Sequence, residues 1–228
     1  IMAAGVFVLS PRVLTTLGSI SSETLPMMLA PWVLLPVVRA LDGDTSGAPG
    51  RDVLGRRNTL WRDAFRSAAA VALMGAVNAV ATLAAVGVAA VWWLMHPLVM
   101  RNIRRWWMFG AWWALGLAMA CAWWIVPLLI LSRVSPPFLD FIESSQVTTE
   151  WTSLTEVLRG TSSWTPFVSP ERVAGAVLVT QPAAVVATGL LAAAGLTGLS
   201  MRHMPFRGRL ITITVLGLCL MCAGYAGG

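Results

Sequence analysis

The fold of this chain is decided by residues 67–98, SAAAVALMGAVNAVATLAAVGVAAVWWLMHPL. One helix over these 32 residues would be about 48 Å long, whereas the hydrocarbon core of a bilayer is roughly 30 Å thick. The stretch from Gly75 to Asn78 is the most polar part of the run, and its glycine favours a bend. We therefore predict two helices that form a hairpin with Asn78 at its tip.

The composition is that of an integral membrane protein. Hydrophobic residues make up 57% of the chain and charged residues 11%, against roughly 25% charged residues in soluble domains. The mean hydropathy is +0.74. We predict an all-α membrane protein, a polytopic helical bundle with about five or six crossings, in which residues 1–228 form one membrane domain. Because the first residues lack a basic n-region and both ends lie in apolar sequence, we expect an internal fragment of a larger protein.

Apolar stretches outside the hairpin predict further helices. Residues 25–38 contain three prolines and predict a short, kinked helix. Residues 106–131, 173–199 and 210–226 predict three more crossings. Within the polar segment 39–66, arginines and apolar side chains are spaced as on an amphipathic helix that lies in the membrane interface.

The arginines indicate which loops face the cytoplasm. All 16 basic residues are arginine. Segments 39–66, 101–105 and 202–209 hold twelve arginines and four aspartates, whereas 11–24 and 132–172 hold four arginines and six acidic residues. By the positive-inside rule the first group is cytoplasmic and the loop 132–172 is extracytoplasmic, in a multi-pass protein of the plasma membrane. This sidedness requires the hairpin, and it explains a pI of 10.9 without binding to nucleic acid.

Chemistry on the outer side would involve the loop 132–172, which holds half of the acidic residues in the chain. A carboxylate there could act as general base on a sugar hydroxyl, and an arginine could bind a lipid phosphate. The candidate substrate contacts are Arg12, Glu23, Asn78, Asp140, Glu143, Glu156 and Arg159. No spacing in the sequence matches a metal site or a Ser-His-Asp set, so we expect neither a metal nor another cofactor.

Several of these candidates also have a structural explanation. Arg12 and Glu23 could form an ion pair at a helix end. Asn78 could cap the second helix of the hairpin. Asp140 and Glu143 would share one face of a short helix and could simply be solvated.

The stretch TSLTEVLRG predicts a helix of one or two turns inside the loop. Thr152 or Ser153 would cap its start, and Gly160 would end it. Glu156 and Arg159 are three residues apart on this helix and could pair with each other instead of binding a substrate.

Four stretches of the sequence resemble a known family. They are SPRVLTTLGSISSETLPMMLAPWVLLPVVRALDG, ALMGAVNAVATLAA, SPPFLDFIESSQVTTEWTSLTEVLRGTSSWTPFV and the closing segment from GRL to AGYAGG. They resemble the large membrane α-(1→3)-arabinofuranosyltransferases of actinobacterial cell-wall synthesis, within the glycosyltransferase-C superfamily, and the resemblance runs through nearly the whole chain. It implies a bundle of many membrane helices that takes sugar from a polyprenyl-phosphate carrier on the outer face.

The resemblance also implies substrates: decaprenyl-phosphoryl-arabinose as donor and the arabinan of arabinogalactan and lipoarabinomannan as acceptor, which gains α-(1→3) branches. It places the catalytic aspartate upstream of Ile1, so we assign no catalytic residue. The alternative is a transporter or flippase of lipid-linked sugars, which would need inverted repeats and charges at the bilayer midplane that the sequence does not show. Membrane lipids are further partners, and the arginine-rich loops leave room for a cytoplasmic partner.

Overall fold

The chain folds into helices. The computed structural model describes residues 2–17, 21–42, 53–99, 103–134, 152–162 and 173–226, and every regular element in these ranges is an α-helix, as predicted. The helices are α1 (Met2–Val8), α2 (Pro11–Thr16), α3 (Ser21–Asp42), α4 (Val53–Met74), α5 (Ala79–Val99), α6 (Ile103–Leu131), α9 (Leu154–Arg159), α11 (Val173–Thr180), α12 (Pro182–Ser200) and α13 (Arg207–Ala226). They gather into two compact units. We call Leu25–Ser135 the hairpin unit, and Ile1–Thr24 together with Pro136–Gly228 the split unit.

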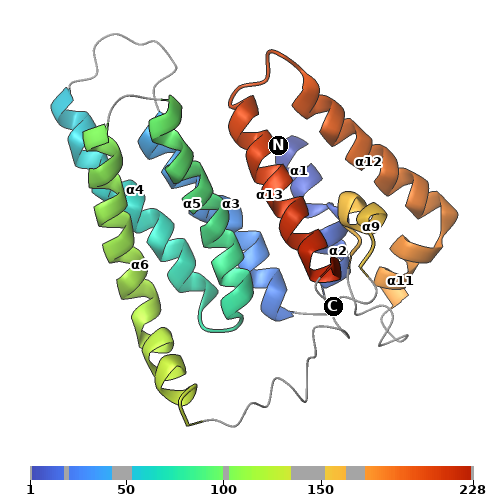
Figure 1. Cartoon of the computed structure of the whole chain (residues 1–228), viewed down its shortest axis with the longest axis horizontal. Helices are drawn as coiled ribbons and strands as arrows, with labels where there is room; N and C mark the ends of the chain where they lie inside the picture. The colour runs from blue at the N-terminus through green and yellow to red at the C-terminus, as the bar shows by residue number, and fades with distance from the viewer. Residues whose placement is uncertain are drawn as a thin grey trace. The chain divides into compact units, whose positions relative to one another are not determined.

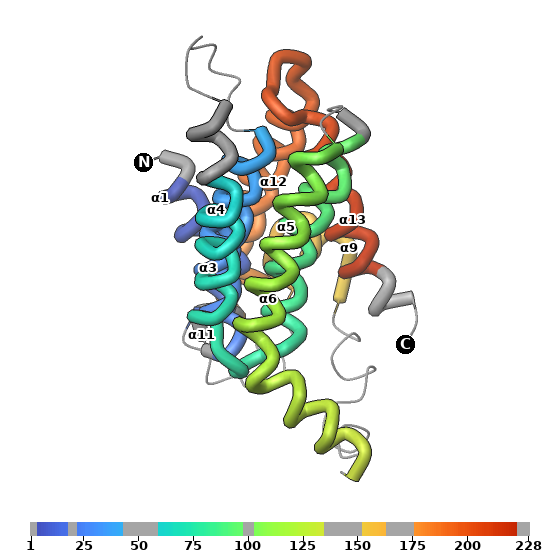
Figure 2. Tube along the Cα trace, turned by 90° about the vertical axis from the view of Figure 1, so that its left-hand side faces the viewer, coloured from blue at the N-terminus to red at the C-terminus, as the bar shows by residue number. Residues whose placement is uncertain are grey.

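The hairpin unit consists of α3 to α6, which run alternately up and down in chain order (Figure 1). Figure 2 shows that the C-terminal end of α6 extends beyond the turn between α4 and α5. At the opposite end, the Arg105 Nε donates a hydrogen bond to the Ala40 carbonyl at 2.9 Å, and the Trp92 indole N–H donates to Asp42 Oδ2 at 2.8 Å. The last turn of α3 therefore lies beside the end of α5 and the start of α6.

α4 and α5 form the predicted hairpin. α4 ends at Met74, Gly75 has a φ of 65°, and α5 begins at Ala79. Asn78 Oδ1 accepts a hydrogen bond from the Ala81 N–H at 2.9 Å, which satisfies one of the free donors at the start of α5. The hairpin is confirmed, and Asn78 has the capping role that was one of its two explanations.

α4 is longer than expected and merges two predicted pieces. The amphipathic segment within residues 39–66 is its first part, and the helix continues without a break to Met74. Its buried side chains include Leu60, Ala64, Ser67 and Val71. Their spacing of three or four residues makes one stripe across both pieces, and the burial of that stripe favours a single helix.

α3 is also longer than expected. It has 22 residues, from Ser21 to Asp42, where the sequence predicted a short helix over 25–38. Three prolines lie inside it, at positions 26, 31 and 36. Each removes one backbone donor, which a membrane helix tolerates when neighbouring groups satisfy the freed carbonyl.

Small side chains and one chain of polar contacts hold α4 against α6. A Cβ added to Gly116 of α6 would lie only 2.8 Å from the Ala68 Cβ of α4. The Trp113 indole N–H donates to Ser67 Oγ at 3.0 Å, and the Ser67 hydroxyl donates to the Val33 carbonyl of α3 at 2.8 Å. Close backbone approach at small residues and hydrogen bonds between helices are the usual means of helix association in membranes.

A reciprocal tryptophan pair joins α5 to α6. The rings of Trp93 and Trp106 are stacked, with centroids 4.5 Å apart and planes inclined by 10°. The Trp106 indole N–H donates to the Trp93 carbonyl at 2.8 Å, and the Trp93 indole N–H donates to the Trp106 carbonyl at 3.3 Å. Both indoles therefore satisfy their polar group within the protein while packing an apolar ring.

In the split unit, the crossing predicted over 173–199 is interrupted just before Pro182, which separates α11 from α12. Because proline has no N–H, the Leu178 carbonyl four residues earlier receives no hydrogen bond from its own helix. The Arg159 guanidinium of α9 supplies one, from NH2 to the Leu178 carbonyl at 2.6 Å. The Arg159 Nε also donates to Thr188 Oγ1 of α12 at 2.9 Å. The last residue of α9 thus binds both sides of the break.

Four of the described helices are long and apolar enough to cross a membrane: Ser22–Asp42, Ala79–Pro97, Ile103–Leu131 and Pro182–Ser200. Large apolar side chains are exposed on them, among them Leu83 at 70% and Met119 at 66%. Such exposure would be unfavourable in water and suits contact with lipid.

Candidate functional site

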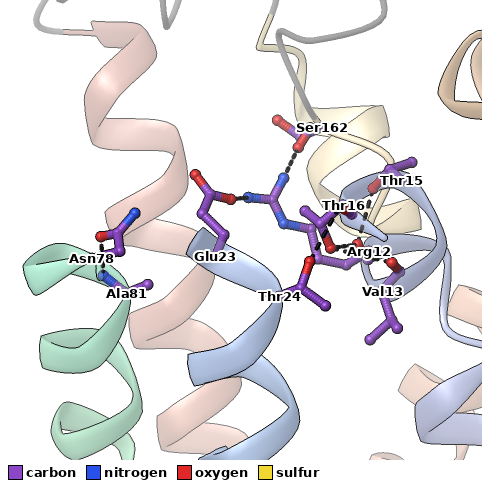
Figure 3. Close-up of polar contacts among 9 residues, drawn as sticks. All are labelled: Arg12, Val13, Thr15, Thr16, Glu23, Thr24, Asn78, Ala81 and Ser162. Carbon is purple, nitrogen blue, oxygen red and sulfur yellow. Dashed lines mark hydrogen bonds and ion pairs between the residues drawn. The ribbon is translucent and has the colours of Figure 1, made fainter. Parts of the chain in front are cut away.

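Arg12 is the centre of the polar cluster in the split unit. Its NH2 lies 3.1 Å from Glu23 Oε2, and its NH1 donates to the Ser162 carbonyl. Figure 3 shows the guanidinium held between these two partners, which come from separate parts of the sequence. The side chains of Arg12 and Glu23 remain 36% and 28% exposed, so the guanidinium is oriented but still accessible. Of the two explanations for these residues, the ion pair is present.

Local hydrogen bonds fix the backbone that carries Arg12. Pro11 occupies the first turn of α2, where its missing N–H costs nothing. The hydroxyls of Thr15 and Thr16 donate to the Arg12 carbonyl at 3.0 and 2.8 Å. The Thr24 hydroxyl donates to the Thr16 carbonyl at 3.1 Å, which ties the first turn of α3 to α2.

The short helix α9 lies beside the part of the chain that carries Arg12. Ser153 caps its start, with its side chain accepting from the Glu156 N–H, and Gly160 ends it with a φ of 71°, so both predicted ends are confirmed. A Cβ added to Gly160 would lie 3.7 Å from the Arg12 backbone nitrogen. The C-terminal end of α9 therefore lies against the start of α2.

A cavity of about 460 Å³ opens beside Arg12, between α9, α12 and α13. Its lining comprises Arg12, Val157, Leu158, Gly160, Ser162, Ala192, Leu196, Ile213, Thr214, Gly217, Leu218 and Met221. Arg12 is the charged member of this set, and most of the others are apolar. An open apolar cavity with one arginine in its wall suits a ligand that combines a hydrocarbon chain with an anionic group.

The cavity walls on α12 and α13 were not predicted from the sequence. A signal was available in their spacing, since Ala192 and Leu196 are four residues apart, as are Ile213, Gly217 and Met221. Such spacing marks one face of each helix. It did not show that the two faces meet each other across a loop helix.

The remaining predicted contacts lie elsewhere. Asn78 belongs to the hairpin unit as a helix cap. The Arg159 guanidinium is engaged by Leu178 and Thr188 rather than by Glu156. Asp140 and Glu143 lie outside the described residues.

Glu156 is half-buried on α9. Burial raises the pKa of its carboxyl above the ordinary value, and the nearby positive charge of Arg159 offsets part of this shift. Among the described residues, no group of three or more His, Cys, Asp or Glu side chains could hold a metal ion.

Two curated relatives are similar to the whole chain. It is 59% identical over 228 residues to the alpha-(1->3)-arabinofuranosyltransferase of Mycolicibacterium smegmatis. It is 57% identical over the same length to the enzyme of that name from Mycobacterium tuberculosis. The chain spans 15% of the length of each relative.

A solved structure and a family model are similar to this chain as well. The cryo-EM structure of the arabinofuranosyltransferase AftD from Mycobacteria matches 98% of this chain, with a TM-score of 0.69 and 48% identity, and this match covers 16% of that structure's chain. Together with the apolar helices, this shows a multi-pass membrane protein. The family model described as alpha-(1->3)-arabinofuranosyltransferase, N-terminal GT-C domain, matches residues 1–228. The chain therefore belongs to the α-(1→3)-arabinofuranosyltransferase family and lies within its N-terminal GT-C domain.

Proposed function

We propose that this chain is part of an enzyme that transfers arabinofuranose from decaprenyl-phosphoryl-arabinose to arabinan, forming α-(1→3) branches. The family supplies the reaction class. The observation that carries the choice of donor is the cavity of the split unit, whose lining combines apolar residues with Arg12. The walls suit a polyprenyl chain, and the guanidinium suits its phosphate.

The reaction forms one bond and breaks another at the anomeric carbon of the donor. An acceptor hydroxyl oxygen bonds to this carbon and gives its proton to a base. The bond from the carbon to the phosphate oxygen breaks, and the lipid phosphate leaves with the electron pair and one more negative charge. Hydrogen-bond donors and positive charges that are held where this negative charge develops lower the activation barrier. Arg12, oriented by Glu23 and the Ser162 carbonyl, would act on this leaving group. A transporter of lipid-linked sugars is not favoured, because the relatives are named as transferases.

Replacement of Arg12 in the full-length enzyme tests this proposal. Arg12→Ala should lower kcat/KM for transfer from decaprenyl-phosphoryl-arabinose roughly 100-fold, the usual effect of removing one charge-stabilising donor. Arg12→Lys should lower it less, because the charge remains while the two-pronged geometry is lost. The matched control is Arg202→Ala, an exposed arginine between α12 and α13. Wild-type transfer by Arg12→Ala would remove the cavity from the donor site.

We further propose that α9 faces away from the cytoplasm and that the arginine-rich segments face it. Support comes from the charge asymmetry and from the Arg105–Ala40 contact, which puts the end of α3 and the start of α6 at one end of the hairpin unit. In a background without other reactive cysteines, Thr155→Cys should react with an impermeant thiol reagent added to intact cells, and Ser46→Cys should not. The reverse labelling pattern would refute this orientation.

A further inference from the structure

Glu156 departs from the role that its local sequence predicts. Ser153 and Glu156 have the spacing of a capping box, in which the serine accepts from the glutamate N–H and the glutamate carboxylate returns to the serine N–H. The first half is present, with the Glu156 N–H at 3.3 Å from Ser153 Oγ. The second half does not form among the described residues, and Glu156 Oε2 is instead buried with no hydrogen-bond partner there.

The other local partner is also committed elsewhere. Arg159 lies one turn along α9, but two of its N–H groups bind the Leu178 carbonyl and Thr188 Oγ1. A carboxylate oxygen that is buried without a hydrogen bond is costly, and native proteins keep very few such groups. A local rule that is broken without local compensation is expected chiefly at functional sites.

Glu156 adjoins the wall of the neighbouring cavity. The next two residues, Val157 and Leu158, belong to the cavity wall, and Gly160 at the end of the same short helix lies against Arg12. The α12 and α13 residues of the wall carry no charge. Among the described residues, Arg159 lies near the Glu156 carboxyl, and Arg12 is the charged residue of the cavity wall. A ligand whose phosphate is held at Arg12 would bring the group attached to that phosphate close to α9.

We propose that Glu156 is a positioning residue whose Oε2 accepts a hydrogen bond from a hydroxyl of the sugar carried by the lipid phosphate. This rests on the proposed function, and it adds to it the group that distinguishes the sugar-bearing lipid from the bare lipid phosphate. A site built to bind a substrate hydroxyl strongly discriminates against a ligand that lacks it, because the site's polar group is then left unpaired.

Binding to the full-length protein in detergent separates the two claims. Decaprenyl-phosphoryl-arabinose and decaprenyl phosphate are titrated against wild type, Glu156→Ala and Arg12→Ala. Glu156→Ala should weaken binding of the sugar-bearing lipid about 10-fold or more, as expected for one hydrogen bond to a charged group, and leave decaprenyl phosphate unchanged. Arg12→Ala should weaken binding of both lipids. The control is Thr155→Ala, an exposed neighbour on α9, which should change neither.

The outcomes are distinguishable. If Glu156→Ala weakens both lipids equally, or neither, the inference is wrong while the proposed function stands. If it weakens binding of an arabinan oligosaccharide but not of the donor, the carboxyl serves the acceptor, and the inference is also wrong. If wild type binds neither lipid, the proposed function fails, and the inference that rests on it fails as well.

Unfolding of the ligand-free protein gives a second test that does not depend on substrate. Because the folded state raises the pKa of Glu156, the folded protein binds the proton more tightly than the unfolded chain, so ionisation of this group lowers stability as pH rises. Glu156→Gln should therefore raise the unfolding temperature at pH 7, and the gain should shrink as pH falls toward about 4, the range of an ordinary carboxyl. A lower unfolding temperature at pH 7 would mean that a cationic group of the whole protein pairs with Glu156, which would overturn the proposal.

Discussion

The two units differ in how far their polar groups are used in contacts between helices. In the hairpin unit, polar side chains join helices to one another, as in the contact from Trp113 through Ser67 to the Val33 carbonyl. In the split unit, Arg12 is held but accessible, Glu156 has a buried oxygen without a partner among the described residues, and a cavity adjoins α9. We propose that the polar groups of the hairpin unit serve mainly to hold its helices together, whereas those around α9 are available to a ligand. Stability tests this contrast, measured as the unfolding temperature and the free energy of unfolding of the full-length protein in detergent.

The largest effect is expected where Gly116 of α6 lies against Ala68 of α4. Gly116→Leu would place a Cβ 2.8 Å from the Ala68 Cβ, so the two helices would have to separate. We expect the free energy of unfolding to fall by about 3 kcal/mol, at the upper end of the usual cost of overpacking. Gly87→Leu is the control in the same unit, because a Cβ there meets no atom within 4 Å. Equal effects of the two substitutions would show that the hairpin unit is not tightly packed.

A smaller effect is expected at the helix break of the split unit. Arg159→Ala leaves the Leu178 carbonyl without its donor, which should cost about 2 kcal/mol. Arg207→Ala is the matched control, because its Nε donates to the Leu199 carbonyl at an exposed site where water can replace it. Adding Pro182→Ala to Arg159→Ala should recover part of the loss, since the new N–H can reach Leu178. A double variant as unstable as the sum of the single variants would argue against this account.

The smallest effect is expected at Ser67. Ser67→Ala removes the acceptor of the Trp113 indole and the donor to the Val33 carbonyl, and hydrogen bonds between membrane helices average about 0.6 kcal/mol each. We expect the free energy of unfolding to fall by about 1 kcal/mol. Ser132→Ala is the control, because the Ser132 hydroxyl is exposed and donates to Leu129 within its own chain segment. If Ser67→Ala unfolds like wild type, the polar contacts of Ser67 do not contribute to the stability of the hairpin unit.

Features that depend on local sequence were predictable. The hairpin followed from the length of the apolar run 67–98 and from Asn78, and the ends of α9 followed from Ser153 and Gly160. Capping and left-handed glycine act within a few residues, and bilayer thickness limits the length of one continuous apolar run. The continuity of α4 was not predicted, because its apolar stripe is buried only by packing against other helices such as α6.

The site was less predictable because it depends on separate segments meeting. The sequence suggested that Arg12 and Glu23 could pair, but it did not suggest that Ser162 would join them. It assigned Arg159 to a substrate or to Glu156, because nothing local shows that a carbonyl freed by Pro182 lies beside this arginine. The cavity likewise arises only when the faces of α12 and α13 meet α9.

The bond from Arg159 to the Leu178 carbonyl has a consequence for the history of the family. Pro182, at the start of α12, leaves the Leu178 carbonyl without a helical donor, and Arg159, at the end of α9, supplies one, so Arg159 cannot change alone without loss. Covariation of these two positions is therefore expected across homologues: members with an ordinary residue in place of Pro182 should be released from the need for arginine at 159.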